Sequence, residues 1–254
     1  ITNAPLTIRR PPGFYHHLLA GESELRALPN ESRSLVACAN EQLSAFNGEP
    51  KSLNALHFSA ALSQLPVLGD DIEASAGAFP HGEFDGDGQQ VDLRSSNSWV
   101  QEVTDVSLAE LLEVHAVNSL VPFLLIQRLE PLLLRSPHPD RYIVNVSAME
   151  GQLNARFKTG FHPHTNMAKA GMNMITRTCA ARFAERGIFM NSVDTGWVTN
   201  EFPHAKAERM KQDGFEPPLD EINGAARVCH PILAGLSGET PLFGTFLKDY
   251  RETS

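Results

Sequence analysis

Residues 141–193 contain two strand-like runs separated by a long amphipathic helix, and this order limits the chain to few folds. Arg141–Ser147 reads RYIVNVS and Ile188–Val193 reads IFMNSV, which is typical of strands buried on both faces. Between them, Asn166–Arg186 has apolar side chains every three or four residues and is followed by Gly187, as expected for an amphipathic helix and its C-terminal cap. Strand, helix and strand in this order predict a right-handed parallel βαβ unit.

Further elements extend this unit on both sides. Ser107 and Glu110 form a predicted capping box that opens a helix running to Leu134, and Pro122 is expected to kink that helix. A later helix and a last strand are predicted at Pro218–Gly235 and Leu242–Leu247.

We therefore predict an α/β fold, a Rossmann-like doubly wound parallel sheet with the helix Asn166–Arg186 packed on one face. Ligands of such sheets bind at the carboxyl ends of the strands. Here those ends are Ser147–Gly151 and Asp194–Thr199.

Charge and composition argue against several function classes. The 254 residues carry 21 Lys and Arg against 30 Asp and Glu, a net charge of −9, which disfavours nucleic acid and acidic membranes as partners. The longest strongly apolar stretch, Leu120–Ile126, is shorter than the roughly 20 residues of a membrane span. Three cysteines without a CxxC pair indicate a reducing compartment, so we expect a cytoplasmic protein. No HExxH motif occurs, and no metal site is expected.

The second half of the chain resembles the short-chain dehydrogenase/reductase family. The similar segments are Val117-Asn118 with Phe123, the strand and turn Ile143–Gly151, Lys169 with the following Ala-Gly-Met-Asn, the run Arg186–Val193, Gly196-Trp197-Val198 and, at the start of the chain, Ile1–Ala4. The resemblance implies catalytic roles for Asn118 and Lys169. It also implies NAD or NADP as cofactor, with Asn3, Ala4, Lys169, Gly196 and Val198 as cofactor-binding residues.

Two catalytic positions of the family hold other residues here. The family's tyrosine lies four residues before the lysine, where this chain has Thr165, and its serine corresponds to Ala148. The family mechanism needs a phenol whose pKa a nearby ammonium lowers, and a threonine hydroxyl has no accessible pKa. His164 is the best available substitute acid, since histidine titrates near neutral pH. The alternative is that His162 and His164 are loop histidines beside Pro163.

Three positions keep two interpretations each. Asn118 acts in a proton relay, or it is a buried side chain bonded to the backbone near the kink. Asp194 is a cap of the loop after its strand, or an acid in a pocket. Lys169 is a cofactor-binding residue, as the resemblance implies, or a lysine on a helix surface.

The first part of the chain differs most from the family pattern. No GxGxxG or GxxxGxG sequence follows a predicted strand, so the loop that holds a dinucleotide pyrophosphate is missing. Because Ile1–Ala4 is similar to the end of the family's fourth strand, we expect the chain to lack the glycine-rich N-terminal half. We expect a single domain over residues 1–254, in which about 14–100 form an irregular insertion before the helix carrying Asn118, and 101–254 form the core of the resemblance.

These features support two functions. One is an NAD(P)-dependent oxidoreductase by ancestry, acting on an unknown carbonyl or alcohol, with impaired chemistry and doubtful cofactor binding in this chain. The other is a non-catalytic pseudoenzyme or interaction protein of the same fold. A small-molecule substrate and a homo-oligomer are the expected partners.

Overall fold

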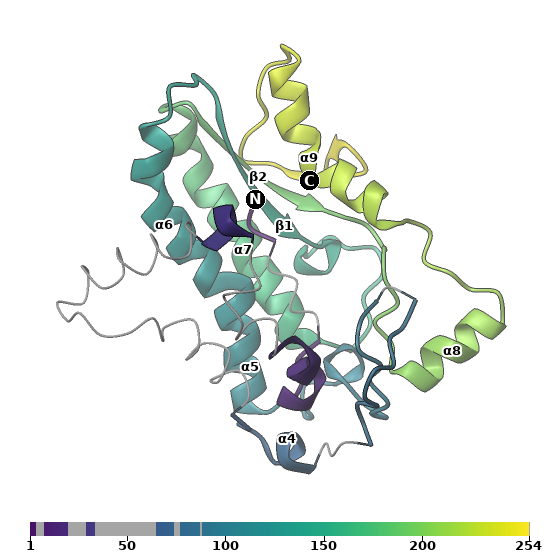
Figure 1. Cartoon of the computed structure of the whole chain (residues 1–254). Helices are drawn as coiled ribbons and strands as arrows, with labels where there is room; N and C mark the ends of the chain where they lie inside the picture. Colours follow the sequence, from purple (N-terminus) through teal and green to yellow (C-terminus); the bar gives the residue numbers. More distant parts are fainter. Residues whose placement is uncertain (4–7, 20–28, 34–64, 74–76, 87, 254) are drawn as a thin grey trace. The chain divides into compact units, whose positions relative to one another are not determined.

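The computed structural model describes residues 1–3, 8–19, 29–33, 65–73, 77–86 and 88–253 (Figure 1). The chain forms two compact units. The first contains residues 1–9 and 95–254, and the second contains residues 10–94. The first unit carries every predicted strand and every candidate site residue.

A four-stranded sheet forms the centre of the first unit, in the order β1 (Arg141–Ser147), β2 (Ile188–Asp194), β3 (Phe246–Lys248) and β4 (Arg251–Glu252). Strands β1, β2 and β3 are parallel, and β4 is antiparallel to β3. The predicted adjacency of the first three strands and the parallel α/β class are confirmed. The prediction for β3 was wrong in its bounds, because Gly244, with a φ of 71°, turns the chain before the strand begins.

Helices cover both faces of this sheet (Figure 1). On one face, α7 (Pro163–Ala184) and α6 (Val121–Leu134) enclose a core of buried apolar residues, Ile126, Ile143, Ala180, Phe183, Ile188 and Met190. On the other face, α9 (Glu221–Leu236) contributes Val228 to a second core with Val144, Val146, Val193 and Leu247. The alternation of Val144 and Val146 with Ile143 and Asn145 along β1 produces these two cores. The predicted doubly wound arrangement is thereby confirmed for this sheet.

Polar side chains continue the contact between α7 and the sheet. Asn145 Nδ2 donates to Thr176 Oγ1 (2.9 Å), and Thr176 Oγ1 lies 2.8 Å from Ser192 Oγ. These three side chains form a hydrogen-bonded row that joins β1, α7 and β2. At its far end, Thr2 Oγ1 donates to Asn145 Oδ1 (2.6 Å). These buried groups are all hydrogen-bonded, as burial requires.

A single long helix, interrupted by one wider turn, runs beside α7. It consists of α5 (Leu108–His115), the π-helical turn η4 (Ala116–Leu120) and α6. The predicted kink therefore takes the form of a π turn just before Pro122, which occupies the first turn of α6 and so needs no N–H partner.

Among the described residues, the helix Leu108–Leu134 is long and apolar enough, by length and composition alone, to cross a membrane. The sequence prediction considered only Leu120–Ile126 and did not anticipate a candidate of this length. A core helix of a soluble protein can have the same length and apolar composition, so these two properties alone are weak evidence of a membrane span.

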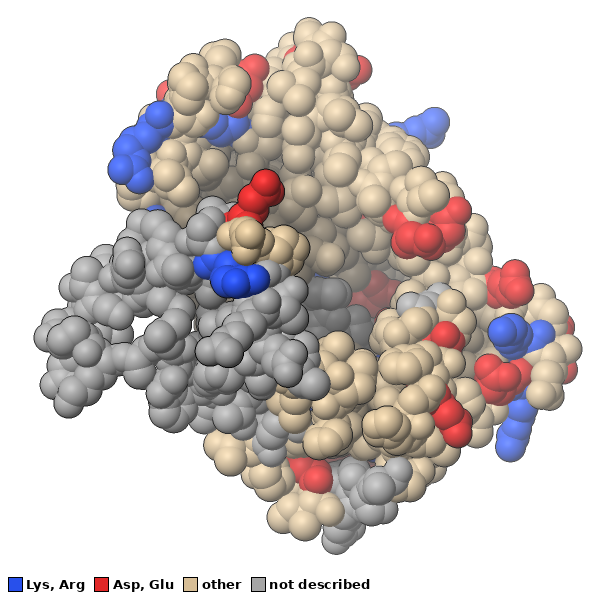
Figure 2. All heavy atoms as spheres, in the orientation of Figure 1, with Lys and Arg blue, Asp and Glu red and all other residues tan. Residues whose placement is uncertain are grey.

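The remaining helix, α8 (His204–Gln212), carries both charge signs. Lys206, Glu208, Arg209 and Lys211 are exposed on it, and Figure 2 shows basic and acidic side chains close together over this helix. Such alternation differs from the one-signed basic surface that a polyanion needs.

The described residues of the second unit include the short helical segments η1 (Pro12–Leu18) and α4 (Gly69–Glu73). Asp92 is its main charged contact: it pairs with Arg10, and Arg94 Nη2 donates to its carboxylate at 2.7 Å. Burial raises the pKa of Asp92, but the hydrogen bonds and charges of both arginines outweigh burial and lower it. The predicted insertion at about 14–100 overlaps this unit, and its place within one domain of 1–254 stays a prediction.

Candidate functional site

Lys169 lies in the second turn of α7 and faces β1. Its side chain is buried, and its Nζ donates to the backbone oxygen of Val146 at 3.1 Å. Burial lowers the pKa of this ammonium from 10.5 to about 8. The interpretation as a helix-surface lysine was therefore wrong, because the side chain points into the unit, towards the end of a strand.

A glycine brings the turn after β1 against the same part of α7. This turn, η5 (Met149–Gly151), ends at Gly151, where a Cβ would lie 2.8 Å from the backbone atoms Ala170 N and Lys169 C. Only a residue without a side chain fits this approach. The turn after β1 therefore lies directly against the part of α7 that carries Lys169.

The two replaced catalytic positions lie in the same region. Thr165 is one turn before Lys169 and is 5% exposed, and its hydroxyl makes no hydrogen bond with the described residues. Ala148 follows β1 directly and begins η5. Ser147 points to α7, where its Oγ donates to Asn173 Oδ1 at 2.6 Å.

Asn118 lies in the π turn η4 and is fully buried. Its Nδ2 donates to Val114 O at 3.0 Å, within its own helix. The next residue connects this turn to α7, since Ser119 Oγ donates to Ala168 O at 2.7 Å. The backbone-bonded interpretation of Asn118 is observed, and its role in a proton relay stays a prediction.

His162 and His164 are not loop side chains in solvent. His162 is 6% exposed, and its ring stacks on Trp99 with centroids 4.0 Å apart and planes 7° apart. His164 is 3% exposed and faces α5, where its Nε2 lies 3.5 Å from Glu110 Oε1. No described hydrogen bond or ion pair joins His164 to Lys169. The role of His164 as a substitute acid stays a prediction.

Glu110 has a different role from the one its sequence position suggests. Ser107 Oγ accepts from Glu110 N at 3.1 Å, as the capping box predicts. The other contact of a capping box, from the Glu110 carboxylate back to the N–H of Ser107, was wrongly predicted. The carboxylate turns inward and accepts from Ser98 Oγ and from Gln101 Nε2. Burial raises the pKa of Glu110, but the nearby ring of His164 and the hydrogen bonds from Ser98 and Gln101 outweigh burial and lower it.

Asp194 organises the carboxyl end of β2. Its carboxylate accepts from the backbone N–H of Met149 and of Gly196, both at 2.6 Å, and Lys248 Nζ lies 3.2 Å away. Of the two interpretations of Asp194, the loop cap is observed.

Gly196 and Val198 follow in this loop and face α9 and the segment before it. A Cβ on Gly196 would lie 2.4 Å from Leu219 Cδ1, and one on Gly224 would lie 3.0 Å from Val198 Cγ2. These two predicted cofactor-binding positions therefore help to fix the loop in place.

The start of the chain lies beside β1. Thr2 forms a parallel bridge with Asn145, in which Thr2 N donates to Val144 O at 2.8 Å. Asn3 is therefore near the strand, as its resemblance to the end of the family's fourth strand implies. Ala4 lies outside the described residues.

Sequence reasoning brought Lys169, Thr165 and Ala148 to one edge of the sheet, and the structure places them there. It missed Glu110 as a buried carboxylate and Trp99 as the partner of His162. The sequence contains one signal that Glu110 faces inward. Glu110 lies four residues before Val114 and eight before Asn118, so all three side chains lie on the same face of one helix.

Comparison with known proteins adds a family match. A family model described as enoyl-(acyl carrier protein) reductase matches residues 95–219. Uncharacterized protein R665 of Acanthamoeba polyphaga mimivirus is 35% identical over 152 residues, which are 57% of this chain and 32% of that protein. The chain thus spans about a third of the length of this curated relative.

Solved structures are similar at lower identity. An NADPH-bound carbonyl reductase from chicken fatty liver has a TM-score of 0.46 and 20% identity, over 65% of this chain and 62% of that chain. A putative short-chain dehydrogenase/reductase from Burkholderia multivorans with bound NADP has a TM-score of 0.44 and 23% identity, over 61% and 59%. The family match and the parallel sheet agree on one conclusion. Residues 95–219 thus resemble the short-chain dehydrogenase/reductase family, and the first unit has the C-terminal part of that Rossmann-like fold.

Proposed function

We propose that this chain descends from an NAD(P)-dependent oxidoreductase acting on a carbonyl or alcohol, and that the family's reaction is impaired in it. One observation carries the proposal. Lys169 is buried against Val146 at the end of β1, while the buried position one turn earlier holds the hydroxyl of Thr165 in place of a phenol.

The described residues fit only one end of a nicotinamide dinucleotide. Lys169 has the donor chemistry to hold a ribose hydroxyl, and Gly196 and Val198 lie in the loop after β2. Asn3 is described near β1, but no glycine-rich turn between a strand and a long helix occurs among the described residues, so nothing here fits the pyrophosphate. When bound, such a cofactor supplies hydride. No step through it is derived for this chain.

The side chains at the site limit what chemistry this chain can perform. The hydroxyl of Thr165 cannot donate a proton near neutral pH, because an aliphatic alcohol has no pKa in that range. The ammonium of Lys169, with a pKa of about 8, can gain or lose a proton, but it donates to a backbone oxygen. Ala148 offers no hydroxyl to orient a carbonyl oxygen. The site therefore keeps a position for a ribose and lacks the proton donor.

The decisive test restores the two missing groups. The double variant Thr165→Tyr with Ala148→Ser is assayed beside the wild type, with NADH or NADPH and a broad panel of aldehydes and ketones, by following the absorbance of the reduced nicotinamide. The matched control is Thr165→Phe with Ala148→Ser, which adds the ring without the hydroxyl. We expect turnover in the tyrosine variant alone. Equal turnover in the wild type would contradict impairment.

A non-catalytic protein of the same fold is the second candidate. It is favoured by the loss of both the tyrosine and the serine at positions whose surroundings are otherwise kept. On this proposal, neither NADH nor NADPH binds the chain with low micromolar affinity, which titration calorimetry measures. Absence of turnover in every variant, with no cofactor binding, would support it over the enzyme.

The partner and location predictions stay part of this proposal. The net charge of −9 favours a small molecule or a second copy of the chain over nucleic acid or an acidic membrane. The described cysteines, Cys179 and Cys229, form no disulfide with each other, consistent with the proposed cytoplasmic location. Light scattering of the purified chain tests for the homo-oligomer.

A further inference from the structure

Several buried titratable groups surround the start of α7 and play no part in the proposed chemistry. Glu110 and His164 are 5% and 3% exposed, and their side chains meet between α5 and α7. His162 and His115 lie near enough for their charges to interact with that of His164. The cluster therefore contains three imidazoles and one buried carboxylate, that of Glu110, which lies beside His164.

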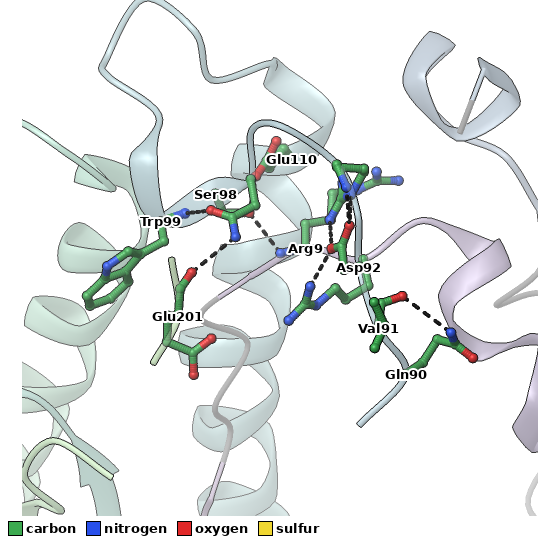
Figure 3. A network of polar contacts seen from close by, with 11 residues as sticks. Arg9, Gln90, Val91, Asp92, Ser98, Trp99, Glu110 and Glu201 are labelled. Carbon is green, nitrogen blue, oxygen red and sulfur yellow. Dashed lines mark hydrogen bonds and ion pairs between the residues drawn. The ribbon is translucent and has the colours of Figure 1, made fainter. Parts of the chain in front are cut away.

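The carboxylate connects three separate segments. Ser98 Oγ donates to Glu110 and accepts from Arg9 N at 2.8 Å, so residues 9, 98 and 110 come together (Figure 3). Arg9 also pairs with Glu113 on the same side of α5. Trp99, the residue after Ser98, carries the ring that covers His162.

The backbone at His162 is held in an unfavourable conformation by these contacts. Its φ is 44° and its ψ is 46°, in the left-handed region, and Pro163 follows it. Its Nδ1 lies 2.9 Å from Trp99 O, and its backbone N donates to Gln101 O at 2.8 Å. Such a conformation costs of order 1–3 kcal/mol and persists only where the surroundings fix it. Loss of the contacts would let the first turn of α7 relax.

We infer that Glu110, His164 and the stacked pair of Trp99 and His162 form an acid-sensitive clasp that fixes the first turn of α7, and with it Thr165. Protonation of His162 and His115 at acidic pH places positive charge within this buried cluster, beside the ring of His164, and separates the segment 97–101 from α7. This inference does not depend on the proposed function.

The charged groups around the cluster support this direction. Burial lowers the pKa of His162 and of His115, and the charge of His164 lowers both further. The hydrogen bond to Trp99 O and the charge of Glu150 raise the pKa of His162, and Lys158 lowers it. On the loop before α5, Glu102 and Asp105 are exposed, and Glu113 is paired with Arg9. The buried carboxylate of Glu110 lies against His164.

Hydrogen exchange of the full chain tests the clasp directly. Amides of 164–167 are compared at pH 7.5 and at pH 5.0, after correction for the intrinsic pH dependence of exchange. We expect protection in this turn to fall about tenfold or more at the lower pH, the effect of one pKa unit of coupling, while amides of β1 and β2 keep their protection. Unchanged protection of 164–167 would overturn the inference.

Two variants separate the clasp from general acid sensitivity. Glu110→Gln removes the buried carboxylate and is expected to move the exchange transition to higher pH, whereas Glu102→Gln removes an exposed one nearby and is expected to leave it unchanged. Should Glu110→Gln fail to fold, Trp197→Phe leaves Trp99 as the single tryptophan. Its fluorescence is then expected to change with pH before the far-ultraviolet circular dichroism does. Coincident fluorescence and dichroism transitions would contradict a local clasp.

Discussion

Helix α7 is held differently along its length. From Ala168 to Phe183 its buried side chains pack against the sheet, with an apolar core on one side and the hydrogen-bonded row through Thr176 on the other. From His162 to Thr165 it is held by an aromatic stack, a carboxylate and a left-handed residue. Packing of the first kind changes little with pH, whereas the second kind depends on charge. The candidate catalytic positions Thr165 and Lys169 lie where the two kinds meet.

The largest effect is expected where packing alone holds the helix. Ile188 is fully buried under α7, and Ile188→Ala removes side-chain contacts and leaves a cavity, so the free energy of unfolding should fall by about 2–5 kcal/mol. Urea unfolding measures it. The control Ile222→Ala changes a side chain that is 71% exposed on α9, and it should cost less than about 0.5 kcal/mol. Equal losses in the two variants would mean that the sheet face is not the stabilising core.

Lys169 is a buried charged residue within the part of α7 that packs against the sheet. Because its pKa is lower in the folded chain, the unfolded chain binds the proton first, and the free energy of unfolding rises as pH increases from about 8 towards 10.5. Lys169→Met should therefore stabilise the chain at pH 7 by about 2 kcal/mol and remove this part of the pH dependence. Thermal unfolding of both proteins from pH 7 to 10 measures it. A destabilised methionine variant would show that the ammonium is favourably bound.

The hydrogen-bonded row should respond less strongly. Thr176→Val keeps the shape of the side chain but leaves Asn145 Nδ2 and Ser192 Oγ without this partner, which should cost about 1–2 kcal/mol. The matched variant Thr178→Val changes a threonine that is exposed on the same helix and should be nearly neutral. Urea unfolding of the two variants side by side gives the difference, and no difference would mean that water replaces the lost hydroxyl.

The same contrast explains what could be predicted from the sequence. The strands and α7 follow from local patterns, since β-branched runs and 3.6-residue periodicity are properties of neighbouring residues. Lys169 and Thr165 could be placed because the resemblance to the short-chain dehydrogenase/reductase family implies their positions on the helix between the two strands. The meeting of Glu110 with His164 could not be predicted, because it depends on how α5 lies beside α7. In the sequence, Glu110 reads as a capping residue, and only the packed helices show its carboxylate turned inward.

The smallest effect concerns His115, at the edge of the clasp. Burial lowers its pKa from 6.5, and the charge of His164 lowers it further. The unfolded chain therefore binds this proton first, and stability falls as pH drops below 6.5. His115→Gln should match the wild type at pH 8 and lose less stability between pH 6.5 and 5.5, measured by urea unfolding at each pH. The control His138→Gln removes an exposed histidine and should follow the wild-type pH dependence. If His115→Gln also follows the wild type, His115 contributes nothing to the acid sensitivity. That sensitivity would then lie with His162, whose ring stacks on Trp99, and with Glu110, which lies beside His164 in the first turn of α7.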